Sequence, residues 1–242
     1  MRRGEYGFDA PIFLIIFGFL SLASGIAVVV AFSQGDSRLA RQMSISFVIF
    51  LANVVSFAHT TRRGKFLEWE RILDSLHLRG DEIVLDMGCG RGAVLTAVAR
   101  RLTTGRVTGV DIWNSSDQSG NGREVALGNA SLEGVSDRVQ VDTGDMRDLP
   151  YADASFDLVV SSLAIHNISS NEGRKKAIVE ALRVLKPGGR LVIADIKATA
   201  LYEQALREAL ALDVVRRRLG WRFWWGNPVA GTTLLTASKP SA

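Results

Sequence analysis

The chain has 242 residues, a formal net charge of +4 and a hydrophobic fraction of 47%, which fits one ordinary domain and an appendage. Its single cysteine, Cys89, excludes an internal disulfide and a cysteine-based metal site, and three histidines argue against a zinc site. We therefore expect no metal in this protein.

Two apolar runs near the N-terminus account for the high hydrophobic fraction. Residues 12–32 and 43–59 contain no Asp, Glu, Lys or Arg. At about 1.5 Å per residue, helices over these runs would measure roughly 31 Å and 26 Å, against a hydrocarbon core of about 30 Å. We predict two transmembrane α-helices, forming a hairpin domain over residues 1–61. A cleaved signal peptide and a hairpin buried in a protein core are the alternatives.

Basic residues predict how this hairpin is oriented. The outer flanks hold five basic residues and the intervening loop holds two, namely Arg2, Arg3, Arg62, Arg63 and Lys65 against Arg38 and Arg41. Because Lys and Arg accumulate in cytoplasmic loops, we expect both termini and the following domain to be cytoplasmic, at an inner or plasma membrane. Anionic lipids of that leaflet suit the pI of about 9.5 at least as well as nucleic acid does.

Residues 62–242 alternate between short apolar runs and helical patterns. This alternation predicts an α/β fold with a doubly wound, mostly parallel sheet that is covered on both faces. We expect helices over 66–78, 93–101, 122–133, 172–184 and 200–219, and strands over 82–87, 106–111, 139–143, 156–161 and 190–195. Residues 221–225 and 232–237 would add an antiparallel hairpin around Gly226-Asn227-Pro228, giving seven strands.

The most informative segment is residues 83–94, Ile-Val-Leu-Asp-Met-Gly-Cys-Gly-Arg-Gly-Ala-Val. An apolar strand ends in Asp86, a turn with Gly88, Gly90 and Gly92 follows, and an apolar helix begins. Glycine permits positive φ and lets a ligand approach bare backbone. The turn therefore predicts a nucleotide-like ligand at the carboxyl end of a strand. It also satisfies a loose dinucleotide pattern, so NAD remains possible at this point.

Three later segments narrow the choice of ligand. Asp111 ends the second strand, 19 residues beyond Gly92, where an acid can accept hydrogen bonds from ribose hydroxyls. Gly144-Asp145-Met146 follows the third strand, where a carboxylate can accept from an adenine amino group. The turn Pro187-Gly188-Gly189 precedes the fifth strand.

In this order and spacing, residues 84–92, 109–111, 144–146, 155–161 and 185–189 resemble the class I S-adenosylmethionine-dependent methyltransferases, specifically the ubiquinone/menaquinone-type group. The resemblance covers roughly residues 66–239. It implies a Rossmann-like methyltransferase domain over residues 62–242. It also implies S-adenosylmethionine as cofactor and S-adenosylhomocysteine as product. A non-catalytic adenosyl-binding protein and a membrane-tethered NAD-dependent reductase are the alternatives.

The resemblance also implies roles for single residues. The methionyl and ribose parts of the cofactor would lie against the loop Gly88, Cys89, Gly90 and Gly92, with Asp86 and Ser161 near the methionyl end. The ribose would be bound by Asp111, Ile112 or Trp113 would lie against the adenine, and Gly144, Asp145 and Met146 would hold the adenine edge. The polar stretch 113–122 stands where many relatives begin a helix at once, and it is a candidate lid.

His166 is the candidate catalytic residue. It lies five residues past the fourth strand, at the edge where the cofactor is expected. Methyl transfer from a sulfonium needs mainly an acceptor held in line, and such positioning can supply roughly 7–11 kcal/mol of the barrier. A base helps when the acceptor is a hydroxyl or an acidic carbon. A purely structural histidine is the alternative.

The two apolar runs bear on the methyl acceptor. A membrane tether raises the effective concentration of acceptors that partition into the bilayer, so we expect a hydrophobic or amphipathic small molecule such as a quinone, an isoprenoid or a phospholipid headgroup. A soluble small-molecule acceptor is the alternative. The fourth strand is followed by Ser161-Ser-Leu-Ala-Ile-His166 and lacks the Asn/Asp-Pro-Pro-aromatic pattern of nucleic-acid amino-methyltransferases, so we expect no nucleic-acid partner. Trp221–Trp225 and Arg216–Arg218 suit either strand packing or a membrane interface.

Overall fold

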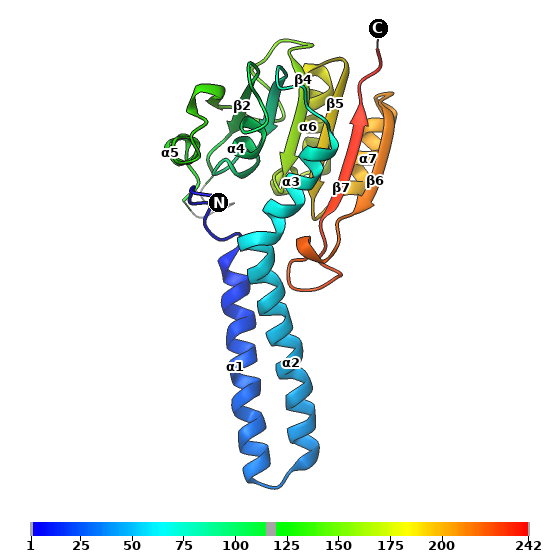
Figure 1. Ribbon diagram of the computed structural model, residues 1–242. Coiled ribbons are helices and arrows are strands. Elements are labelled where there is room, and N and C mark those ends of the chain that lie inside the picture. Colours follow the sequence, from blue (N-terminus) through cyan, green and yellow to red (C-terminus); the bar gives the residue numbers. More distant parts are fainter. Residues whose placement is uncertain (1, 115–119, 242) are drawn as a thin grey trace.

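Two long helices project from an α/β domain in the computed structural model, which describes residues 2–114 and 120–241 (Figure 1). Helices α1 (Pro11–Ser33) and α2 (Ser37–His59) lie side by side. By length and composition, both could cross a membrane. Their outer surfaces expose large apolar side chains such as Phe19 and Val29, each 69% exposed. The alternative of a hairpin buried in the core is therefore wrong.

Helix α2 continues into the domain as one uninterrupted helical segment. A π-helical turn, η1 (Thr60–Gly64), joins it to α3 (Lys65–Ser75), which begins one residue before the predicted helix. Trp69, Ile72 and Leu73 of α3 are buried in the domain core. The hairpin and the first helix of the domain are thus one continuous helical element, and the packing of α3 fixes the direction in which the hairpin leaves the domain.

Seven strands form one sheet in the order β3-β2-β1-β4-β5-β7-β6. Five pair in parallel, namely β1 (Ile83–Met87), β2 (Arg106–Asp111), β3 (Val139–Thr143), β4 (Phe156–Ser162) and β5 (Leu185–Asp195). Strand β7 (Thr233–Ser238) is antiparallel to β5 and to the edge strand β6 (Leu212–Arg218). The predicted seven-stranded, mostly parallel Rossmann-like sheet is confirmed.

Helices cover both faces of this sheet. One core cluster joins it to α3, α4 (Ala93–Ala99) and α5 (Arg123–Leu132), and the other joins it to α6 (Asn171–Val184) and α7 (Thr199–Glu208). Three 3-10 turns lie in the connections, η2 (Ser136–Arg138), η3 (Ile165–Asn167) and η4 (Trp221–Phe223). The carboxyl ends of the parallel strands lie at the edge of the sheet that faces the hairpin (Figure 1).

The predictions near the C-terminus are wrong in two places. The helix expected over 200–219 ends at Glu208, and residues 212–218 form β6. Leu210 and Asp213 have positive φ, which ends the helix, while pairing with β7 outweighs the good helix propensity of Leu and Arg. Residues 221–225 form η4 and a loop rather than a strand. A smaller difference is that β5 begins at Leu185, five residues before the predicted strand.

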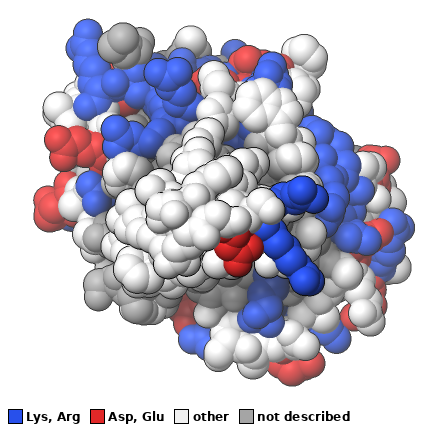
Figure 2. Space-filling model, turned by 90° about the horizontal axis from the view of Figure 1, so that it is seen from below, with Lys and Arg blue, Asp and Glu red and all other residues white. Residues whose placement is uncertain are grey.

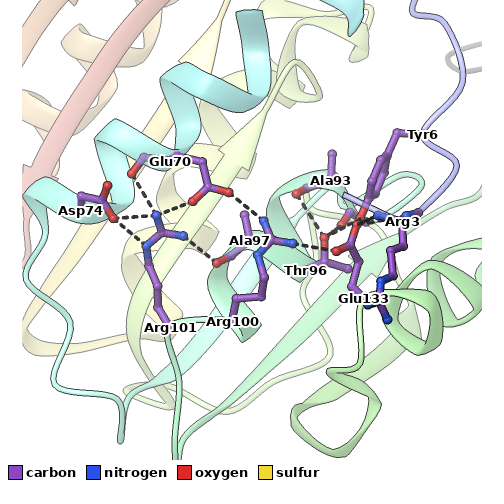
Figure 3. A network of polar contacts seen from close by, with 12 residues as sticks. Arg3, Tyr6, Glu70, Asp74, Ala93, Thr96, Ala97, Arg100, Arg101 and Glu133 are labelled. Carbon is purple, nitrogen blue, oxygen red and sulfur yellow. Dashed lines mark hydrogen bonds and ion pairs between the residues drawn. The ribbon is translucent and has the colours of Figure 1, made fainter. Parts of the chain in front are cut away.

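A chain of ion pairs joins the N-terminal segment, α5, α4 and α3 (Figure 3). Backbone N–H groups of Arg3 and Gly4 donate to Glu133 Oε1, each at 3.0 Å. Arg100 contacts Glu133 at 3.3 Å and Glu70 of α3 at 2.7 Å. The Tyr6 hydroxyl is within 2.8 Å of Thr96 Oγ1, and burial raises the pKa of Tyr6 to about 12. These contacts hold the N-terminal segment and α3 against the helix that follows the glycine turn.

Replacing Gly64 by alanine should weaken the junction between the hairpin and the domain. A Cβ at this position would lie 1.8 Å from the backbone oxygen of Arg222, so one element must move. We expect a loss of about 1–3 kcal/mol in stability, typical of overpacking, measured by thermal unfolding of the full chain in detergent. Gly128→Ala in α5 is the matched control, because a Cβ there meets nothing within 4 Å and should raise stability by roughly 0.5–1 kcal/mol. Equal melting temperatures for both variants would contradict this account.

Candidate active site

The glycine turn after β1 lies over the carboxyl end of β2. The N–H groups of Gly88 and Cys89 donate to Val110 O at 2.8 Å and 3.2 Å. Gly88 has φ of +76°, and a Cβ there would lie 2.2 Å from the Cβ of Ala164. Only glycine fits this position, because both the backbone conformation and the close approach of the loop after β4 exclude a side chain.

Asp86 is a buried carboxylate that faces the main cavity of the domain. Asp86 is only 1% exposed, and neither of its carboxylate oxygens has a hydrogen-bond partner among the described residues. Burial raises the pKa of Asp86 to about 7. An unpaired buried carboxylate is costly, so a cationic group in the cavity would be stabilised beside it. The amino and sulfonium groups of S-adenosylmethionine carry that charge.

Asp111 ends β2 and fastens the glycine turn. Its Oδ2 accepts from Gly90 N–H at 2.9 Å, and its Oδ1 accepts from Trp113 N–H at 2.8 Å. The carboxylate lines the cavity and retains lone pairs that can accept from ribose hydroxyls.

Cys89 also lines the cavity, and burial raises the pKa of its thiol well above the usual value, which keeps it neutral and poorly nucleophilic.

The residues expected around the adenine divide into two groups. Ile112, Asp145 and Met146 line the cavity, and Ile112 is 55% exposed. Arg147 binds the Asp145 carboxylate at 2.6 Å and lowers its pKa. Trp113 does not line the cavity, because its indole N–H donates to Thr143 Oγ1 at 2.8 Å.

Two predicted glycines hold the loops rather than line the cavity. Gly92 precedes α4 with φ of +80°, and Gly144 N–H donates to Asp111 O at 3.1 Å. Within the candidate lid 113–122, residues 115–119 lie outside the described part of the chain. Asn114 and Asn121 border the cavity on either side of that segment.

Ser161 does not reach the cavity, which corrects its expected place at the methionyl end. Its hydroxyl is buried and donates to Met87 O at 2.7 Å. Strand β4 extends one residue further than predicted, and successive residues of a strand point to opposite faces. Ser162 therefore lines the cavity instead, where its Oγ accepts from the indole N–H of Trp69 at 2.9 Å.

His166 lines the cavity from the 3-10 turn after β4 and forms a pair with Asp195, which the sequence reasoning missed. His166 Nδ1 lies 2.6 Å from Asp195 Oδ1. Asp195 is fully buried at the end of β5 and also accepts from Ile196 N–H at 2.8 Å and Tyr202 OH at 3.2 Å. With Nδ1 bonded to this carboxylate, Nε2 is the ring nitrogen available to take a proton. One feature of the sequence could have indicated Asp195 as a site residue, because, like Asp86 and Asp111, it is an acid that ends an apolar run.

One cavity of about 620 Å³ extends from Asp86, Asp111 and His166 to the foot of the hairpin. Aromatic side chains from the hairpin, α3 and the loop before β7 line its far end, namely Phe13, Phe17, Phe57, Phe66, Trp69 and Trp225. Lys65 and Asp9 also line the cavity and form an ion pair at the foot of the hairpin. The cavity therefore combines carboxylates near the glycine turn with aromatic rings and one ion pair near α1 and α2. No group of three or more potential metal ligands occurs within residues 2–114 and 120–241.

The fold and this site define a Rossmann-like nucleotide-binding domain. Residues 85–193 match the family model described as "Methyltransferase domain". The chain is 39% identical over 127 residues to methyltransferase GfsG of Streptomyces halstedii, covering 52% of this chain and 42% of that protein. It is 37% identical over 128 residues to 27-O-demethylrifamycin SV methyltransferase of Amycolatopsis mediterranei, covering 52% and 43%. The alignments thus span less than half of these relatives.

A third relative is the ubiquinone/menaquinone biosynthesis C-methyltransferase UbiE of Roseobacter denitrificans, 32% identical over 126 residues, with coverage of 52% and 47%. Among solved structures, geranyl diphosphate C-methyltransferase from Streptomyces coelicolor has a TM-score of 0.58 at 17% identity, covering 72% of this chain and 78% of that one. This likeness shows the fold alone. Residues 85–193 thus match a methyltransferase domain, and the predicted enzyme class and cofactor, S-adenosylmethionine, are confirmed for that segment.

Cofactor affinity should fall as the pH drops through about 7. Asp86 is ionised above that pH and attracts a cation, and its protonation removes the attraction, by up to about tenfold in affinity per pH unit. Calorimetry with S-adenosylmethionine across this range measures the effect. Asp86→Asn should bind weakly with no pH dependence. Asp145→Asn is the control and should keep the pH slope, since its pKa is already lowered by Arg147. A flat affinity in the unaltered protein would refute the assignment.

Proposed function

We propose that this protein is a membrane-anchored methyltransferase that transfers the methyl group of S-adenosylmethionine to a lipid-like or membrane-partitioned small molecule. The domain and both termini would lie on the cytoplasmic side. The observation that carries the proposal is the single cavity that joins the glycine turn and His166 to Phe13, Phe17 and Phe57 at the foot of the hairpin.

The residues near the glycine turn suit the cofactor. Gly88 and Gly90 line the cavity beside the place proposed for it, Asp86 would balance its positive charge, and Asp111 would bind the ribose. The bound cofactor supplies an activated methyl group. The remaining tasks fall to the chain itself, which must hold the acceptor in line, exclude water and remove a proton where the acceptor carries one.

The His166–Asp195 pair supports an acceptor that loses a proton. Asp195 orients the imidazole through Nδ1, so Nε2 can take the proton of a hydroxyl or an acidic carbon while the new bond to the methyl carbon forms. Trp69, held by its hydrogen bond to Ser162, and the neighbouring Phe66 line the cavity and exclude water.

The apolar end of the cavity supports a membrane-partitioned acceptor. Phe13 and Phe17 come from α1 and Phe57 from α2, at the end of the hairpin nearest the domain. A hydrophobic tail could lie between these rings and enter from the bilayer without crossing water. The Asp9–Lys65 pair lies on this route and offers a charged contact to the polar head of the acceptor.

Changing the His166–Asp195 pair should slow catalysis and leave cofactor binding intact. We expect His166→Ala and Asp195→Asn to lower kcat by about 10²–10⁴, with calorimetric affinity for S-adenosylmethionine unchanged. His77→Asn, at an exposed position with positive φ that asparagine tolerates, is the control and should retain full activity. Activity above a tenth of normal in both site variants would show that no base is needed.

The acceptor class is tested with the full chain in proteoliposomes, a labelled methyl donor and a total membrane lipid extract. We expect label in the organic phase, and we expect Phe17→Ala to raise the apparent KM for the lipid acceptor by about tenfold, consistent with the loss of one buried aromatic contact. Phe19→Ala is the matched control, since Phe19 is exposed on the same helix and does not line the cavity. Label confined to water-soluble products or to protein would rule out the lipid acceptor, and binding of NADH in place of S-adenosylmethionine would rule out methyl transfer.

A further inference from the structure

A second cavity, of about 330 Å³, adjoins the first near the edge of the sheet. Ile196 lines both cavities, and the loop before β7 separates them, with Ala230 on one side and Val229 and Gly231 on the other. The residues lining the second cavity are Ile196, Lys197, Ala198, Thr199, Arg216, Arg217, Arg218, Val229, Gly231 and Thr233. Four of them are basic and none is acidic, so this cavity attracts anions.

The basic side chains of this second cavity are not equivalent. Successive strand residues point to opposite faces, and Arg216 forms an ion pair with Glu203 of α7 at 2.6 Å. Arg216 and Arg218 therefore share the face of the sheet that carries α7, where Lys197 precedes that helix. Glu203 neutralises Arg216, whereas the Arg218 side chain, within the described residues, donates only to the backbone oxygen of Pro228, at 3.4 Å. Arg217 also lines the cavity, but by the strand alternation it belongs to the other face of the sheet. Lys197 and Arg218 are thus the cations on the α7 face that are most available to a ligand.

The loop that lines the second cavity also contacts the end of the hairpin nearest the domain. Asn227 donates to Asn53 Oδ1 of α2 at 3.3 Å, and Thr60 Oγ1 donates to Trp224 O at 2.5 Å. Seen along the hairpin, the underside of the domain shows basic side chains on several sides of the two helices, with acidic side chains among them (Figure 2). Arginines on the edge strand β6 prevent it from pairing with another chain, which explains their presence there. This role does not explain Lys197, nor the position of the cavity beside the hairpin.

Exposed apolar groups of the same loop complete this surface. Val229 is 84% exposed and Trp221 is 53% exposed. The Trp221 ring stacks on His59 at the end of α2, with a centroid distance of 5.0 Å, and Arg222 lies over it at 4.8 Å. Tryptophan and arginine together are typical of the boundary between lipid headgroups and acyl chains.

We propose that this cavity binds the phosphate of an anionic phospholipid from the leaflet next to the domain. Lys197 and Arg218 would contact the phosphate, and Val229 and Trp221 would contact the adjoining acyl region. This inference rests on the membrane anchoring proposed above. Two attachments, the hairpin and this lipid, would fix the tilt of the domain and keep the mouth of the catalytic cavity at the bilayer surface.

The test uses the full chain in nanodiscs of mixed phosphatidylcholine and phosphatidylglycerol. After mild detergent extraction, native mass spectrometry identifies the lipid that stays bound. We expect the unaltered protein to retain phosphatidylglycerol in preference to phosphatidylcholine, and the double variant Lys197→Gln/Arg218→Gln to retain about tenfold less. Arg79→Gln/Arg106→Gln is the matched control. It removes the same charge at the amino ends of β1 and β2, far from the hairpin, where both residues are exposed, and should behave like the unaltered protein.

Three outcomes would overturn the proposal. They are equal retention by the double variant and the control, equal retention of the two lipids, or protection against thermal unfolding by inorganic phosphate alone with no lipid preference. Calorimetry with S-adenosylmethionine shows whether each variant is folded. Lipid retention is measured without methyl transfer, so it can succeed where no label reaches a lipid. Failure of the protein to float with liposomes would instead contradict the anchoring.

Discussion

The continuous helix from α2 through the π-helical turn to α3 is the constraint on which the rest of the structure depends. Because α3 is packed into the core by Trp69, Ile72 and Leu73, the hairpin cannot swing independently of the sheet. The absence of a side chain at Gly64 lets the loop before β7 pass against the turn. As a result, the carboxyl edge of the sheet and the foot of the hairpin enclose one cavity rather than two separate surfaces.

This constraint gives the cavity its two different ends. The end near the glycine turn carries the fully buried carboxylate of Asp86 and the oriented carboxylate of Asp111. The other end is lined by aromatic rings from both hairpin helices. The ion pairs of Arg100 with Glu70 and Glu133 tie α3 to α4 and α5, so any movement of the hairpin would also move the helix that follows the glycine turn.

From the sequence we could predict the residues around the glycine turn but few of those at the other end of the cavity. Asp86, Gly88 and Asp111 could be found because each ends a strand or begins the next turn, which is local information. Lys65 and Asp195 could not, since the first is brought to the cavity by the helix that joins hairpin and domain, and the second matters through its contact with His166. The five parallel strands were predicted from their short apolar runs. Strand β6 was missed because an edge strand with exposed Val215 and arginines has no buried face to reveal it.

The order of groups along the cavity restricts the acceptor further. Under the proposed function, the tail of the acceptor would lie among the aromatic rings of the cavity, and the atom that receives the methyl group would belong to its polar head, near His166. Asp195 accepts from two backbone N–H groups and from Tyr202 besides the imidazole, which fixes the ring in place. A rigid base suits a head group that always presents its proton from the same direction. A ring-bound hydroxyl or an enol-like carbon, oriented by a tail held between Phe13, Phe17 and Phe57, meets that condition better than a freely rotating chain end.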